Sequence, residues 1–158
     1  MLTHEVTHLA QQGHGPVPSW LGEGTAEFTA HRQSDLPPAA IAGSALDDVR
    51  AGRLPSTWPD PTARSEATGP TNVTGPTDAT GQTHATGRTG TGSSWGGYAL
   101  SWLACLYIAE TWSAEALLKL YDTVAAGATV HEALPAVLDV TEEEALIGWS
   151  DWLHVLVG

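Results

Sequence analysis

Residues 98–121, with the sequence YALSWLACLYIAETWSAEALLKLY, contain two helical patterns in succession. In residues 98–110 the large apolar side chains recur at intervals of three and four, which places them on one face of an α-helix. Ser113 follows as a candidate N-cap, and a second helical pattern then runs toward a glycine stop at Gly127. This part of the chain is therefore predicted to form a helical hairpin.

Capping patterns predict further helices on both sides of this hairpin. Residues 129–132 and 141–144 both read Thr-x-x-Glu, a capping box that satisfies free backbone groups in the first turn of a helix. Residues 44–47 read Ser-x-x-Asp, and Gly52 follows as a stop, which predicts a short helix there. No segment alternates apolar and polar residues for long, so the fold class is predicted to be mostly α.

The composition limits the kinds of partner. The chain has 158 residues, enough for one domain with one core, and no apolar run is long enough to span a membrane. Eighteen acidic against six basic residues give a net charge of −12, which argues against nucleic acid and anionic lipid surfaces as partners. Cys105 is the one cysteine, and its apolar neighbours predict a buried thiol. No targeting signal is visible at the start, so the sequence does not indicate a compartment.

A six-residue repeat occupies the middle of the chain, where each copy in residues 67–90 holds Thr-Gly-x-Thr. A hexapeptide β-helix would need an apolar residue in every rung, and Ala or Val at one position in six supplies little. A segment of Gly, Pro and Thr without large apolar side chains buries too little apolar surface to offset the entropy lost on ordering the chain. We therefore predict a disordered low-complexity insertion at 55–94, and one domain formed by 1–54 and 95–158.

The candidate metal-binding and catalytic residues are concentrated near the start, in the sequence HEVTH at residues 4–8. On a helix, His4 and His8 lie one turn apart on the same face, so both imidazoles can reach one metal ion, and Glu5 projects beside it. This H-E-x-x-H pattern is typical of zinc proteases, in which the glutamate is the general base. A surface helix with two solvated histidines is the alternative interpretation.

A zinc site of this kind needs a third protein ligand and an open position for water. Residues 18–28, PSWLGEGTAEF, are predicted to form a helix that has Ser19 as its N-cap and folds back antiparallel to the first helix. The spacing of four places Glu23, Glu27 and His31 on one face of it. Solvated helix charges are the ordinary interpretation of such a triplet, and the residue string around Glu23 argues against it.

The two motifs together resemble the gluzincin metallopeptidases, and most closely their small minigluzincin or peptidase MA-like group. In that group H-E-x-x-H precedes P-x-W-L-x-E-G-x-A-E and an aromatic residue, and residues 18–28 fit this pattern. The resemblance implies that His4, His8 and Glu23 bind Zn²⁺. It also implies that Glu27, one turn after the third ligand, holds a zinc-bound histidine in the correct tautomer.

The resemblance extends past the repeat. Residues 98–101, Tyr-Ala-x-Ser, are similar to the tyrosine-bearing segment of the family, which implies that the Tyr98 phenol stabilises the oxyanion formed during hydrolysis. His31 offers two further possibilities, as that donor or as the third ligand in place of Glu23. A surface histidine paired with Glu27 is its ordinary interpretation.

The function implied by the resemblance is zinc-dependent hydrolysis of peptide bonds in a peptide or protein substrate, with Glu5 as the general base. The implied fold is the helical C-terminal part of a zincin-like catalytic domain. Relatives have a sheet upstream of the zinc helix, whereas only Met1-Leu2-Thr3 precede His4 here, so we expect the chain to be a truncated part of a longer one. The repeat separates the two halves of the predicted site, so a non-catalytic zinc-binding or interaction domain is the alternative function.

Overall fold

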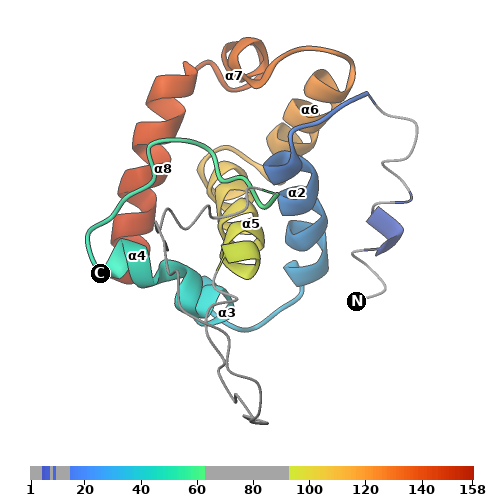
Figure 1. Ribbon diagram of the computed structural model, residues 1–158. Helices are drawn as coiled ribbons and strands as arrows, with labels where there is room; N and C mark the ends of the chain where they lie inside the picture. Colours follow the sequence, from blue (N-terminus) through green and yellow to red (C-terminus); the bar gives the residue numbers. More distant parts are fainter. Residues whose placement is uncertain (1–4, 8, 10–14, 63–92) are drawn as a thin grey trace, which may run out of the picture.

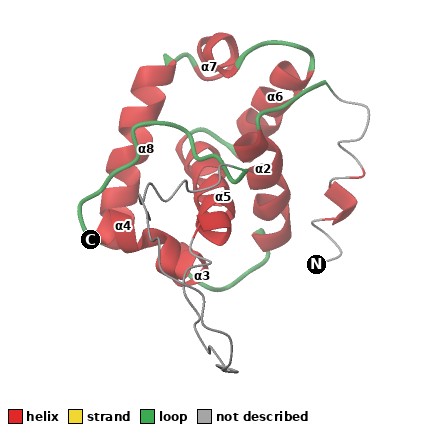
Figure 2. Cartoon of the chain, viewed as in Figure 1, coloured by secondary structure: helices red, strands yellow, loops and turns green. Residues whose placement is uncertain are grey.

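The computed structural model describes residues 5–7, 9, 15–62 and 93–158, with side chains from Gly97 onward in the last range (Figure 1). Every regular element in these ranges is a helix, and Figure 2 shows no strand among them. The prediction of a mostly α fold is confirmed. Residues 63–92 of the insertion that we predicted at 55–94, with the whole six-residue repeat, lie outside the described residues, whereas residues 55–62 and 93–94 are described.

The body is built from helices of very different lengths. The longer described helices are α2 (Ser19–His31), α5 (Ser93–Thr111), α6 (Ala114–Ala125), α7 (Val130–Leu138) and α8 (Glu142–Val157). Shorter elements follow α2, namely α3 (Pro38–Ala42), the 3-10 helix η1 (Gly43–Leu46) and α4 (Asp47–Arg50). Residues 5–7 are helical as well. None of the described helices is both long and apolar enough to cross a membrane.

Helix α5 lies at the centre of the molecule, with α2 and α8 on opposite sides of it (Figure 1). Helices α2, α3, α6 and α8 and the 3-10 helix η1 all contact it. Residues 101–105 of α5 are all buried, so this part of the helix is enclosed on every side and not only on the one face that the apolar spacing predicts. The predicted hairpin is confirmed, because α5 and α6 pack against each other across a short connection.

Three of the predicted caps are present. Ser113 begins α6 by accepting a hydrogen bond from a backbone N–H of the first turn at 3.0 Å. Thr129 and Thr141 begin α7 and α8 with complete capping boxes, in which the hydroxyl and the glutamate each accept from the other residue's backbone N–H. The hydrogen bonds from the threonines lower the pKa of Glu132 and Glu144, because they favour the charged carboxylate.

Two other predicted caps are wrong. Ser19 is the first residue of α2 rather than its N-cap, because Pro18 holds the extended conformation that precedes the helix. Ser44 lies inside η1, and no side-chain cap begins that element. The residue before η1, Ala42, is itself helical, whereas an N-cap residue has a non-helical backbone. The predicted stop at Gly52 is confirmed by its φ of 80°.

Residues 54–62 form no helix, yet they pack against the core. Trp58 stacks on Trp20 with ring centroids 4.5 Å apart, and on Trp149 with centroids 5.5 Å apart. Pro61 is buried as well. Aromatic stacking of this kind buries a large apolar area, so this segment is part of the folded body rather than of a free loop.

Candidate functional site

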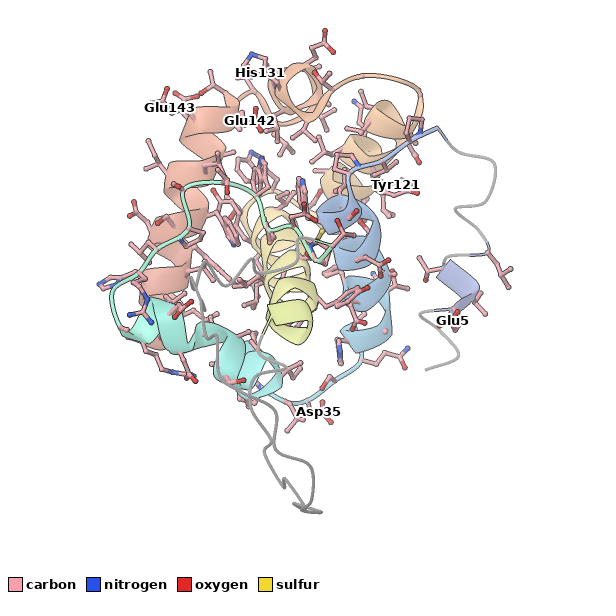
Figure 3. All side chains as sticks on the ribbon, viewed as in Figure 1. Glu5, Asp35, Tyr121, His131, Glu142 and Glu143 are labelled. Atoms are coloured by element: carbon pink, nitrogen blue, oxygen red, sulfur yellow. The ribbon has the colours of Figure 1, made fainter. Side chains whose placement is uncertain are left out.

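The residues predicted to bind zinc are described only in part. His4 and His8 lie outside the described residues, so their assignment stays a prediction. Glu5 belongs to the helical residues 5–7, and its exposed side chain lies to one side of α2 in Figure 3. The side chains that the structure does describe contain no group of three or more His, Cys, Asp or Glu that could hold a metal ion. A site that includes Glu23 therefore depends on the two N-terminal histidines.

Helix α2 places Glu23, Glu27 and His31 along one stripe, as the spacing of four predicts. All three side chains are half-buried. The adjacent face of the helix is buried and holds Trp20, Leu21, Gly24, Thr25 and Ala26. The stripe thus follows the edge of the core, where a carboxylate contacts protein on one side and solvent on the other.

Gly24 is a point where α2 and α5 approach each other closely. A Cβ atom at this position would collide with the carbonyl group of Ser101 and would lie 2.6 Å from the sulfur of Cys105. No other pair of described elements is packed as extensively as these two helices. The presence of glycine after Glu23 is therefore explained by packing, since a larger residue would not fit. The contact brings this turn of α2 directly beside α5.

Glu27 and His31 contact each other across one turn of α2. Nε2 of His31 lies 3.1 Å from Oε2 of Glu27. The imidazole also packs against Trp102 of α5, with ring centroids 5.2 Å apart. His31 is thus paired with Glu27, as its ordinary interpretation expects, and its contact with Trp102 restrains the imidazole; its possible roles as donor or third ligand stay predictions.

Tyr98 is half-buried on α5, one turn before Ser101. Because Ser101 lies against Gly24, the helix that carries Tyr98 packs directly on the helix that carries Glu23. The role of its phenol would be judged from its position relative to His4 and His8, which lie outside the described residues. Its assignment as an oxyanion donor stays a prediction.

The chemistry of the predicted ligand residues fits zinc. Two imidazoles and one carboxylate are a ligand set that zinc commonly takes in catalytic sites. Glu23 occupies a half-buried position beside a close helix contact, which restrains the backbone that carries it. The thiol of Cys105 is an unsuitable ligand, since it is fully buried and burial raises its pKa to about 12.

A second polar cluster was not predicted from the sequence. Trp58 donates from Nε1 to Oε1 of Glu142 at 3.0 Å, and Nδ1 of His131 lies 3.3 Å from Oε2 of the same carboxylate. Figure 3 shows His131 and Glu142 together where α7 meets α8. Trp58 lies 84 residues from Glu142 in the sequence, and His131 belongs to the preceding helix, so no spacing within one helix could have indicated the cluster. The three glutamates in the first turn of α8 were its only visible sign.

Two hollows meet at this cluster, since His131 and Glu142 line both of them. One, of about 790 Å³, lies between α8 and residues 54–56. The other, of about 540 Å³, has Trp20 and Trp58 in its wall. His131 and Glu142 therefore form a wall that the two hollows share.

Comparison of the chain with protein-family models gives no match, and comparisons with curated proteins and with solved structures give none either. The resemblance to the gluzincins therefore rests on the sequence motifs alone.

Proposed function

We propose that the chain is a zinc-dependent metallopeptidase of the gluzincin type, with His4, His8 and Glu23 as the zinc ligands. The observation that carries the proposal is the succession of H-E-x-x-H and W-L-x-E-G-x-A-E in one short stretch of sequence. Support comes from the half-buried stripe of Glu23 and Glu27 on α2. Further support comes from the close packing of this helix on α5, which carries Tyr98.

The proposed residues divide the work of hydrolysis. When bound, zinc supplies the Lewis acidity that activates a water molecule for attack on a peptide carbonyl. Glu5 takes the proton of this water and later returns it to the leaving amine. Glu27 accepts a hydrogen bond from a zinc-binding imidazole and so fixes its tautomer. The Tyr98 phenol donates a hydrogen bond to the carbonyl oxygen as negative charge develops on it.

The exposure of Glu5, Val6 and Leu9 favours a second candidate, a non-catalytic zinc-binding or interaction domain. The exposed fraction is 55% for Val6 and 62% for Leu9, and Glu5 is exposed as well. A general base is most effective in a site from which bulk water is excluded. Zinc binding alone requires only the ligands in a suitable geometry and not the exclusion of water.

Zinc content and hydrolysis, measured on the same preparations, test the proposal and separate its two forms. The full chain is dialysed and its zinc is measured by mass spectrometry, and cleavage is followed with a fluorogenic peptide library. We expect one zinc per chain, and cleavage that a chelator removes and added zinc restores. Glu5→Gln should keep the zinc and lose the cleavage.

A matched variant controls for the loss of any histidine. His154 is exposed on α8 and has no predicted role, so His154→Ala should keep both zinc and cleavage. Loss of zinc in His4→Ala and His8→Ala but not in His154→Ala would support the ligand assignment. A chain that binds no zinc contradicts the peptidase and leaves only an interaction domain without zinc, whereas stoichiometric zinc without cleavage supports the non-catalytic zinc-binding domain.

A further inference from the structure

The larger of the two hollows is a second candidate site, and neither Glu5 nor Glu23 lines it. Its walls are the N-terminal half of α8, residues 54–56 and His131 of α7. Figure 3 shows His131, Glu142 and Glu143 on the side of the molecule away from Glu5, with α2 and α5 in between. Binding at this hollow would not depend on a metal, so the inference that follows does not rest on the proposed peptidase function.

Large apolar side chains are exposed in this hollow. The exposed fraction is 41% for Leu54 and 56% for Ile147, and half-buried Leu146 lies beside Ile147 in the same wall. Exposed apolar side chains are common singly, but two that line one depression form a surface to which an apolar group can bind.

Carboxylates surround this apolar surface. Glu142, Glu143 and Asp151 line the hollow. Glu142 is already engaged, since Trp58 and His131 hold its two oxygens. Glu143 and Asp151 are exposed, and the structure shows no hydrogen bond or ion pair for either within the part of the chain that it describes. Two negative charges thus remain available to a ligand.

The basic residues near the hollow do not neutralise it. Arg53 precedes Leu54 in the chain, but its guanidinium is paired with Asp48. Arg50 is likewise paired with Asp47, at 2.8 Å. Neither arginine lines the hollow; among the described residues of its wall His131 is the one basic side chain, and it contacts Glu142 at 3.3 Å. The hollow therefore combines an apolar floor with net negative charge.

We propose that this hollow binds a short segment of a partner protein that carries both apolar and lysine or arginine side chains. The apolar side chains would lie against Leu54 and Ile147, and a cation would pair with Glu143 or Asp151. Such complementarity of charge steers association and fixes the register of the bound segment. A second copy of the chain is a poor occupant, because its net charge is −12 and it has only six Lys and Arg.

Binding of synthetic peptides to the full chain tests the proposal. Two short fluorescein-labelled peptides, one of leucine and lysine and one of leucine and arginine, are titrated with the protein, and fluorescence anisotropy gives the Kd. A third peptide, of leucine and glutamate, controls for apolar binding alone. We expect the two basic peptides to bind, their affinity to fall as salt is raised, and the acidic peptide not to bind.

Variants locate the binding to the hollow. The double variant with Glu143→Gln and Asp151→Asn removes both free charges. It should weaken binding of the basic peptides by about tenfold. Asp35→Asn with Glu110→Gln removes the same charge from exposed positions outside the hollow, and should leave the Kd unchanged. Ile147→Ser should weaken binding as well, through the apolar floor. Circular dichroism of each variant checks that the helices are intact.

Several outcomes would overturn the proposal. One is that neither basic peptide binds, and another is that the acidic peptide binds as well as they do. Equal loss of affinity in the two charge-removed variants would mean a general attraction to an acidic protein. If sedimentation shows a dimer that Ile147→Ser dissociates, the occupant is a second copy of the chain and not a basic segment.

Discussion

Gly24 of α2 lies so close to the carbonyl group of Ser101 on α5 that no Cβ atom fits between them. This contact joins the helix that carries Glu23 to the helix that carries Tyr98. Elsewhere in α2, at Gly22, a Cβ atom would meet nothing within 4 Å. Two glycines of one helix thus have opposite surroundings, and each predicts a different response to the same substitution.

Gly24→Ala should lower the free energy of unfolding, because the added methyl group forces α2 and α5 apart. Overpacking of this kind costs about 1–3 kcal/mol. Gly22→Ala is the matched control, and it should raise the free energy of unfolding by up to about 1 kcal/mol, since alanine has the higher helix propensity. Denaturant unfolding followed by circular dichroism measures both. Equal stabilisation by the two variants would contradict the close contact at Gly24.

The Cys105 thiol should not react with a thiol reagent in the native protein at neutral pH. It is fully buried, and burial raises its pKa from 9.0 to about 12, so almost no thiolate is present and access is blocked. The thiol should react rapidly after unfolding in guanidinium. Because the unfolded thiol ionises at lower pH than the folded one, stability should decline as pH rises above about 9. Cys105→Ala should reduce this decline of stability at alkaline pH. For the labelling experiment, rapid reaction of the native protein would show that the thiol is accessible.

The capping box of α8 should contribute to stability in a pH-dependent way. Thr141→Ala removes the N-cap hydroxyl and should cost about 1 kcal/mol. The hydrogen bonds from Thr141 lower the pKa of Glu144, so their contribution is complete at neutral pH and is lost as acid protonates the folded carboxylate. Glu144→Gln should therefore flatten the acid limb of a plot of stability against pH. An unchanged acid limb would mean that the box does not hold in solution.

Zinc affinity should distinguish Glu23 from His31. Glu23→Ala removes a proposed ligand and should weaken zinc binding by more than the roughly 10–100-fold typical of a supporting residue. His31→Ala removes only the partner of Glu27 and should have the smaller effect. Competition with a chromophoric chelator gives both affinities. The ligand assignment is wrong if His31→Ala releases the metal while Glu23→Ala retains it.

Tyr98→Phe should lower kcat by about 10²–10³ in an active preparation, while zinc content and KM stay nearly the same. The physical reason is that an oxyanion donor acts in the transition state and contributes little to substrate binding. Tyr107→Phe is a control with another tyrosine of α5, whose buried ring packs against Trp112 and Trp152. An unaltered kcat in Tyr98→Phe would mean that the phenol serves only in packing.

The sequence by itself determined the helices whose signals are local. The apolar spacing in residues 98–110 predicted α5, and Thr129 and Thr141 predicted the starts of α7 and α8. Each of these signals acts within one or two turns, so the residues that carry it meet whatever the rest of the chain does. The stripe of Glu23, Glu27 and His31 followed from the same rule. The incorrect caps, Ser19 and Ser44, depended on the backbone conformation of the preceding residue, which composition does not reveal.

The tertiary structure alone decided which distant residues meet. The contact of Gly24 with Ser101 spans the repeat, and Trp58, His131 and Glu142 come from three separate segments. Such contacts depend on how whole helices pack around α5, and no spacing within one segment encodes them. The H-E-x-x-H motif with His4 and His8, by contrast, could be recognised from the sequence, because candidate ligands one turn apart form a local pattern.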